Sequence, residues 1–165
     1  MNHIVISCIG SDQTGIVDTL SKKISEHDGN WQVSSLHHLS GFFAGVIEVA
    51  VDKSKTQALI SALESIDGLK CQIEIAKSTP KKVSTNLLLE LTANDRAGIV
   101  QEISSVIHQQ GGNLIKLVSS QASAAHTGQL MFKAKVQIAI NEADVDELVS
   151  ALEHIADDLM VDITR

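Results

Sequence analysis

The chain has 165 residues, of which 44% are hydrophobic and 2% aromatic, and it carries a formal net charge of −7. This length suits one ordinary domain or two small ones, and halves of about 80 residues are near the lower limit for independent stability. The acidic balance, without a cluster of Lys and Arg, disfavours direct binding to nucleic acid, because binding to phosphates depends on many cationic contacts.

The first half of the chain contains strand and helix patterns in a regular order. Alternating apolar residues predict strands, and apolar residues at helical spacing predict helices that end where glycine follows. The predicted elements are a strand over 4–9, a helix over 14–27, strands over 31–39 and 42–51, a helix opened by the Ser54-x-x-Gln57 capping pattern, and a strand over 69–75.

The second half of the chain repeats the first. The turn Asp12-Gln13-Thr14-Gly15-Ile16-Val17 returns as Asp95-Arg96-Ala97-Gly98-Ile99-Val100, and Ile60-Ser61-Ala62-Leu63-Glu64 returns as Val149-Ser150-Ala151-Leu152-Glu153. The repeated elements are a strand over 87–92, a helix over 97–110, strands over 114–122 and 130–140, a helix opened by Asn141, and a strand over 159–163. The chain is therefore a tandem repeat of one module.

Each half predicts a βαββαβ module of the ferredoxin-like kind, with a four-stranded antiparallel sheet and two helices on one face. The fold class is α+β. We expect one module over 1–76, a linker over 77–84 that holds the only proline, and a second module over 85–165. Comparing the copies places Cys8 on the core face, and the usual strand order places it near Cys71 as a reduced thiol.

The repeated turn predicts a site for a small ligand. The amides of Gly15, Ile16 and Val17 are among the unpaired donors of a first helical turn, which bind anions. Asp12 could accept a hydrogen bond from an ammonium group in the same turn, and Asn30 adds an amide that both donates and accepts. In the structural alternative, the same Asp caps the helix, Gly permits the turn and Asn accepts a left-handed conformation.

The doubled Asp-x-x-Gly-Ile-Val turn and the Gly-Asn helix exit resemble tandem ACT domains, which are regulatory modules that sense amino acids. As a whole, the chain resembles the glycine cleavage system transcriptional repressor family. This resemblance implies a non-enzymatic allosteric regulator that binds a small amino acid, with glycine as the candidate, and represses transcription through a partner activator protein. It also implies pockets where the first turn of one module meets the Asn region of a neighbouring module.

The candidate ligand-binding residues form two matching sets. They are Asp12, Thr14, Gly15, Ile16 and Asn30 in the first copy and Asp95, Gly98, Ile99 and Asn113 in the second copy. The copies differ before the glycine, where Thr14 matches Ala97, and after the asparagine, where Trp31 matches Leu114. The two pockets therefore need not accept the same ligand.

Two other functions are left open by these patterns: a regulatory subunit of a metabolic enzyme, and a small enzyme. Catalytic motifs are missing from the sequence, so we expect no catalytic residues and no cofactor. Seven histidines lack ligand-like spacing, and the adjacent His37 and His38 point to opposite faces of a strand, so we expect no metal site. We also expect no membrane span, a cytoplasmic location, and an exposed strand edge that favours a homodimer.

Overall fold

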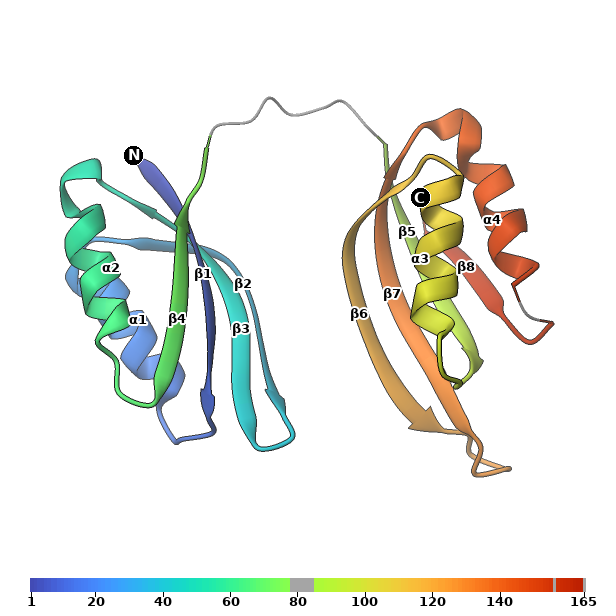
Figure 1. Ribbon diagram of the computed structural model, residues 1–165, viewed down its shortest axis with the longest axis horizontal. Coiled ribbons are helices and arrows are strands. Elements are labelled where there is room, and N and C mark those ends of the chain that lie inside the picture. The colour runs from blue at the N-terminus through green and yellow to red at the C-terminus, as the bar shows by residue number, and fades with distance from the viewer. Residues whose placement is uncertain (78–84, 156, 165) are drawn as a thin grey trace. The chain divides into compact units, whose positions relative to one another are not determined.

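The computed structural model describes residues 1–77, 85–155 and 157–164 (Figure 1). The chain divides into two compact units, Met1–Pro80 and Lys81–Arg165, and each is described by itself. Apart from Lys77, the predicted linker over 77–84 lies outside the described residues.

The first unit consists of β1 (Asn2–Ser11), α1 (Ile16–Glu26), β2 (Asn30–Leu39), β3 (Phe42–Val51), α2 (Thr56–Glu64) and β4 (Leu69–Ile75). The second consists of β5 (Thr85–Asn94), α3 (Ile99–Gln109), β6 (Asn113–Ser123), β7 (Leu130–Ile140), α4 (Val145–Glu153) and β8 (Met160–Thr164). Both sheets are antiparallel, in the orders β2-β3-β1-β4 and β6-β7-β5-β8. The predicted α+β class and both βαββαβ modules are confirmed.

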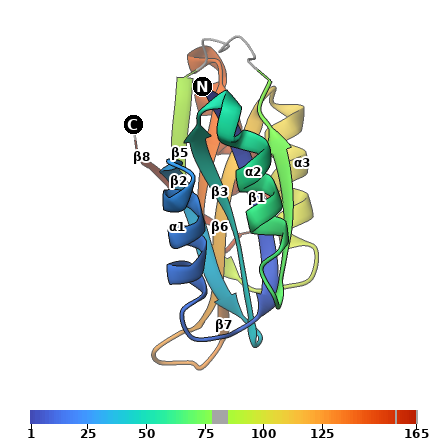
Figure 2. The same ribbon diagram turned by 90° about the vertical axis from the view of Figure 1, so that its left-hand side faces the viewer.

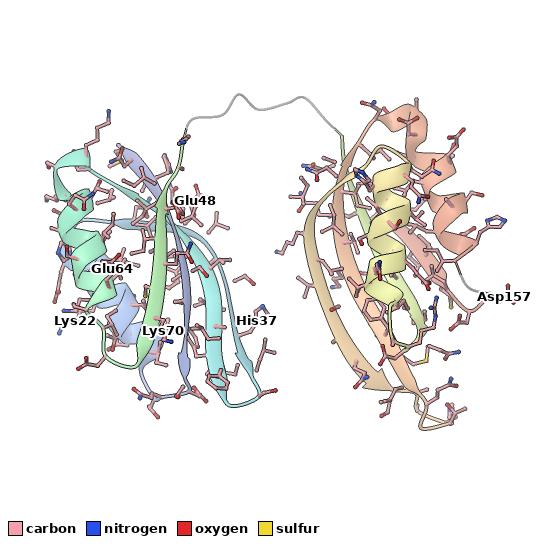
Figure 3. All side chains as sticks on the ribbon, viewed as in Figure 1. Lys22, His37, Glu48, Glu64, Lys70 and Asp157 are labelled. Atoms are coloured by element: carbon pink, nitrogen blue, oxygen red, sulfur yellow. The ribbon has the colours of Figure 1, made fainter. Side chains whose placement is uncertain are left out.

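In each module the two helices cover one face of the sheet, as the side view in Figure 2 shows for α1 and α2. The other face of the first sheet is uncovered within its module. Lys22 on α1 and His37 on β2 accordingly extend to opposite sides (Figure 3). The uncovered face carries exposed apolar side chains, which we call the open-face patch: Val5, Ile9, Val33, Leu39, Phe42 and Val46.

The core of the first module lies between the sheet and its helices. Ile4, Ile6 and Cys8 are at most 3% exposed, which confirms the predicted core face of the first strand. Cys8 lies directly opposite Cys71 in the register of β1 and β4, and both thiols are free. Burial raises the pKa of Cys71 to about 11 and also raises the pKa of Cys8, so both side chains are protonated thiols near neutral pH.

The second helix of each module begins differently from the prediction. A short 3₁₀ helix, η1 (Lys53–Lys55), precedes α2, and its cap is Asp52, whose Oδ1 accepts hydrogen bonds from the backbone N (2.8 Å) and the Oγ (2.6 Å) of Ser54. Ser54 is therefore a donor to the cap, and the prediction that it caps α2 is wrong. Asn141 occupies the matching position before η2 (Glu142–Asp144) without a side-chain cap hydrogen bond.

An ion pair connects the end of α1 to the start of α2. The ammonium group of Lys55 donates to the carboxylate of Asp28, which lies in the turn after α1 with a φ of 53°. This hydrogen bond lowers the pKa of Asp28 and raises that of Lys55.

We expect this pair to make a small, pH-dependent contribution to stability. Because the pKa of Asp28 is lower in the folded state, the contribution is present above the ordinary carboxyl pKa of about 4 and disappears as the pH falls through the lowered value. Urea unfolding of the wild type and of Asp28→Asn should differ at pH 7, and the difference should shrink as the pH falls below the ordinary carboxyl pKa; asparagine tolerates the positive φ. An equal difference at both pH values would contradict the assignment.

Candidate functional site: the mouth of the first helix

The turn between β1 and α1 presents the open end of a helix. Gly15 is the N-cap residue of α1, with a φ of 85°, and no side chain caps this end through a hydrogen bond. A Cβ at Gly15 would meet no atom within 4 Å, so the positive φ alone accounts for the glycine. Since the first amides of a helix have no partner within it, the amides of Ile16 and Val17 remain available to an anion.

A hollow of about 390 Å³ lies at the N-terminus of α1, and we call this end of the helix, with the β1–α1 turn, the first helix mouth. Four of the predicted ligand-binding residues, Asp12, Thr14, Gly15 and Ile16, line it together. Asp12 and Asp18 line the same hollow as the first residues of the helix, so it combines anion donors with acidic residues that attract a cation. A molecule with a carboxylate and an ammonium group matches both.

Two lining residues, His38 and Phe43, were not predicted as part of this site. The Nδ1 of His38 lies 3.0 Å from the Oδ1 of Asp12, and its ring packs edge-on against Phe43 with centroids 5.6 Å apart. Sheet topology brings them here: the backbone N of Asp12 donates to the carbonyl oxygen of Gly41 in the β2–β3 turn at 3.1 Å. The Asp12 carboxylate therefore pairs with a strand residue instead of capping α1.

Asn30 lies at the other end of the same sheet. It opens β2 opposite Ala50, whereas His38 beside the helix mouth lies opposite Phe43. Seven positions separate these partners on β3, or about 23 Å at 3.3 Å for each strand residue. The first module does not bring Asn30 together with Asp12, so a role for Asn30 in this pocket would require a neighbouring module.

The second helix mouth has the same backbone but different side-chain pairing. Gly98 is the N-cap residue of α3 with a φ of 84°, and Ile99 behind it is 4% exposed. The amide of Gln121 donates to the carboxylate of Asp95, and Arg96 binds Glu102 with Nη1 2.9 Å from Oε1. Asn113 opens β6, as Asn30 opens β2.

The charged pair in the second turn has no counterpart in the first turn. Arg96 aligns with Gln13 and Glu102 aligns with Thr19, neither of which is charged. Because Arg96 and Glu102 pair with each other across the second turn, that mouth has an Arg–Glu ion pair, whereas at the first mouth Asp12 pairs with His38. The two mouths therefore offer a ligand different electrostatic surroundings.

Within the described ranges, no group of three or more His, Cys, Asp or Glu side chains is arranged to hold a metal ion. The same residues form no helix with the length and hydrophobicity that a membrane crossing requires.

Comparison with known proteins decides the family of the first module. Residues 2–75 match the family model of the ACT domain. The first module is an ACT domain. The second module has the same strand order and element order, so the architecture fits a tandem of ACT modules.

Two solved structures match the tandem along almost its whole length. An unknown protein from Galdieria sulphuraria shares 25% identity, with a TM-score of 0.82, over 98% of this chain and 96% of that chain. A protein provisionally assigned as a glycine cleavage system transcriptional repressor shares 14% identity, with a TM-score of 0.67, over 99% of this chain and 98% of that chain. At 14% identity, the second comparison shows the fold alone. Among curated proteins, none matches the sequence.

Proposed function

We propose that this tandem ACT protein is a non-enzymatic regulator that binds a small amino acid, with glycine as the first candidate. It represses transcription by contacting a partner activator protein in the cytoplasm, without binding nucleic acid itself. The observation that carries the proposal is the hollow at the first helix mouth, which the uncapped start of α1 lines together with Asp12 and Asp18. The candidate residues are those of the two matching sets, with His38 added to the first.

The charges at the first helix mouth indicate how it would hold an amino acid. The amides of the first turn bind the carboxylate of an amino acid, and Asp12 accepts a hydrogen bond from its ammonium group. His38 shares the Asp12 carboxylate, so the incoming ammonium group competes with the imidazole. In the second module Gln121 pairs with Asp95 as His38 pairs with Asp12, so the ligand ammonium group competes with a protein side chain at both mouths.

The size of the ligand limits the affinity. Glycine has about five non-hydrogen atoms, and at a ceiling of roughly −1.5 kcal/mol for each atom the best dissociation constant is near micromolar. Such affinity suits a metabolite held at high concentration. Because a ligand shifts a conformational equilibrium only through different affinities for its two states, sensing also requires two arrangements of the modules or their partners.

A regulator that does not bind nucleic acid itself needs a surface through which it contacts its partner protein. The open-face patch of the first module supports this part of the proposal. Ile9 is 50% exposed, Val46 49% and Val33 63%, and exposed apolar patches are typical of protein contact sites. The net charge of −7 agrees with a protein partner in preference to DNA.

Calorimetric titration of the folded full-length chain with each of the twenty amino acids tests the sensing function. We expect saturable binding of glycine or another small amino acid in the micromolar to millimolar range, and silence across the panel would reject it. A pull-down from cell lysate tests the output. Recovery of a transcription activator supports the proposal, whereas recovery of a metabolic enzyme alone would instead make the chain a regulatory subunit of that enzyme.

A further inference from the structure

A hollow of about 320 Å³ lies on the second sheet, on the face opposite α3 and α4. The buried residues of β7 belong to the core beneath these helices, and exposed residues alternate with them, Lys133 and Lys135 among them. Figure 1 shows both helices on one side of this sheet, so the two lysines extend from the other side. This sheet hollow includes neither Asp95 nor Gly98 of the second helix mouth.

Strand register places two hydroxyl groups beside the ammonium group of Lys133. Lys133 lies directly opposite Thr92 on β5 and directly opposite Ser120 on β6, and all three residues line the hollow. Since the Cβ atoms of directly opposite residues are about 5 Å apart, three hydrogen-bond donors lie together over three adjacent strands. Within residues 1–77, 85–155 and 157–164, none of these three side chains forms an ion pair or a hydrogen bond, so the donors are available to a ligand.

The charge of the hollow is positive. The charged residues that line it are Lys133, Lys135 and Glu90. The Nζ of Lys135 lies 3.9 Å from the Oε1 of Glu90, so these two charges offset each other and Lys133 remains without a partner in the described ranges. The lining therefore has a net charge of +1 in a chain whose net charge is −7. A hollow lined by charge of one sign attracts ligands of the other sign, which here are anions.

The first module shows that the fold does not require these donors. The matching positions of its sheet hold no ammonium or hydroxyl group: Ala44 for Lys133, Ile9 for Thr92, and His37 for Ser120. The buried positions of the same strands stay apolar, as Phe43 for Phe132 illustrates. Since the same sheet forms without the three donors, they are not needed to build the module.

We propose that the sheet hollow binds the phosphate group of a small ligand, either inorganic phosphate or a phosphate monoester. A phosphate group has three strong acceptor oxygens, which match the donors of Lys133, Thr92 and Ser120. Val118, which is 41% exposed and also lines the hollow, offers an apolar contact to the organic part of an ester. The site is on the open side of the sheet and does not depend on an amino acid bound at either helix mouth.

Calorimetric titration of the full chain with inorganic phosphate and with ethyl phosphate tests this assignment, in about 0.15 M sodium chloride to screen distant exposed charges. We expect saturable binding, which Lys133→Gln weakens by about tenfold or more because it removes a charged hydrogen bond. Thr92→Val and Ser120→Ala should each weaken it by about threefold or more. Glu90→Gln should strengthen it, because Lys135 is then free to attract the anion. Tighter binding of the ester identifies a monoester as the ligand, and equal or weaker binding identifies inorganic phosphate.

Lys22→Gln is the matched control, because Lys22 is exposed on α1 of the first module and its variant loses the same charge. It should bind phosphate as the wild type does, and thermal unfolding verifies that each variant is folded. The proposal is overturned if neither phosphate compound binds saturably, or if Lys133→Gln binds as the wild type does, which would place the anion elsewhere. An equal loss in Lys22→Gln and Lys133→Gln would also overturn it, because net charge alone would then explain the binding. Amino-acid binding should be unchanged in Lys133→Gln, so this test and that of the proposed function fail separately.

Discussion

Replacing Leu20 with alanine should lower the free energy of unfolding of the first module by about 2–5 kcal/mol. Leu20 is fully buried on α1, in the core that the helices share with the sheet. The substitution removes apolar contact area and leaves a cavity that the surrounding side chains fill only partly, so both losses add.

The chain provides its own probe for this measurement. Trp31 is the only tryptophan, and it packs against the core of the first module, so its fluorescence follows the unfolding of that module. Val17→Ala is the control on the same helix, because Val17 is 44% exposed and should change stability by no more than about 0.5 kcal/mol. Equal shifts for the two variants in urea would contradict the assigned core.

Replacing Asp12 with asparagine should weaken binding of the amino acid at the helix mouth by about 10- to 100-fold. The change keeps the shape of the side chain but removes the charge that would receive the ligand ammonium group, and a hydrogen bond to a charged group is worth about 1.5–3 kcal/mol. Asp12 is exposed, so the variant should fold as the wild type does. Calorimetry with the amino acid identified by the panel measures the effect.

Glu26→Gln is the matched control for this prediction. Glu26 is an exposed carboxylate at the far end of α1, so its variant loses the same charge without touching the helix mouth. A similar loss in both variants would show a general effect of net charge. The measurement should be repeated with Asp95→Asn, because Asp95 holds the matching position at the second mouth, where it pairs with Gln121 as Asp12 pairs with His38.

The helix-mouth site was predicted in part. Asp12, Thr14, Gly15 and Ile16 are close in sequence, so the turn that holds them follows from local backbone geometry. His38 was missed, because it reaches Asp12 only through the β2–β3 hairpin and the strand order of the sheet. Asn30 follows α1 directly in sequence yet lies at the far end of the sheet, a separation that the helix and the strand directions produce.

The sequence by itself determined the features that depend on local periodicity and on the repeat. The element order, the two modules, the core face of Cys8 and its pairing with Cys71 all follow from patterns within short segments and from the usual strand order. Tertiary structure decided which side chains meet across segments. Gln121 on Asp95 and His38 on Asp12 are examples. These contacts depend on strand register and loop packing, which long-range hydrogen bonds and core burial set and which no local pattern encodes.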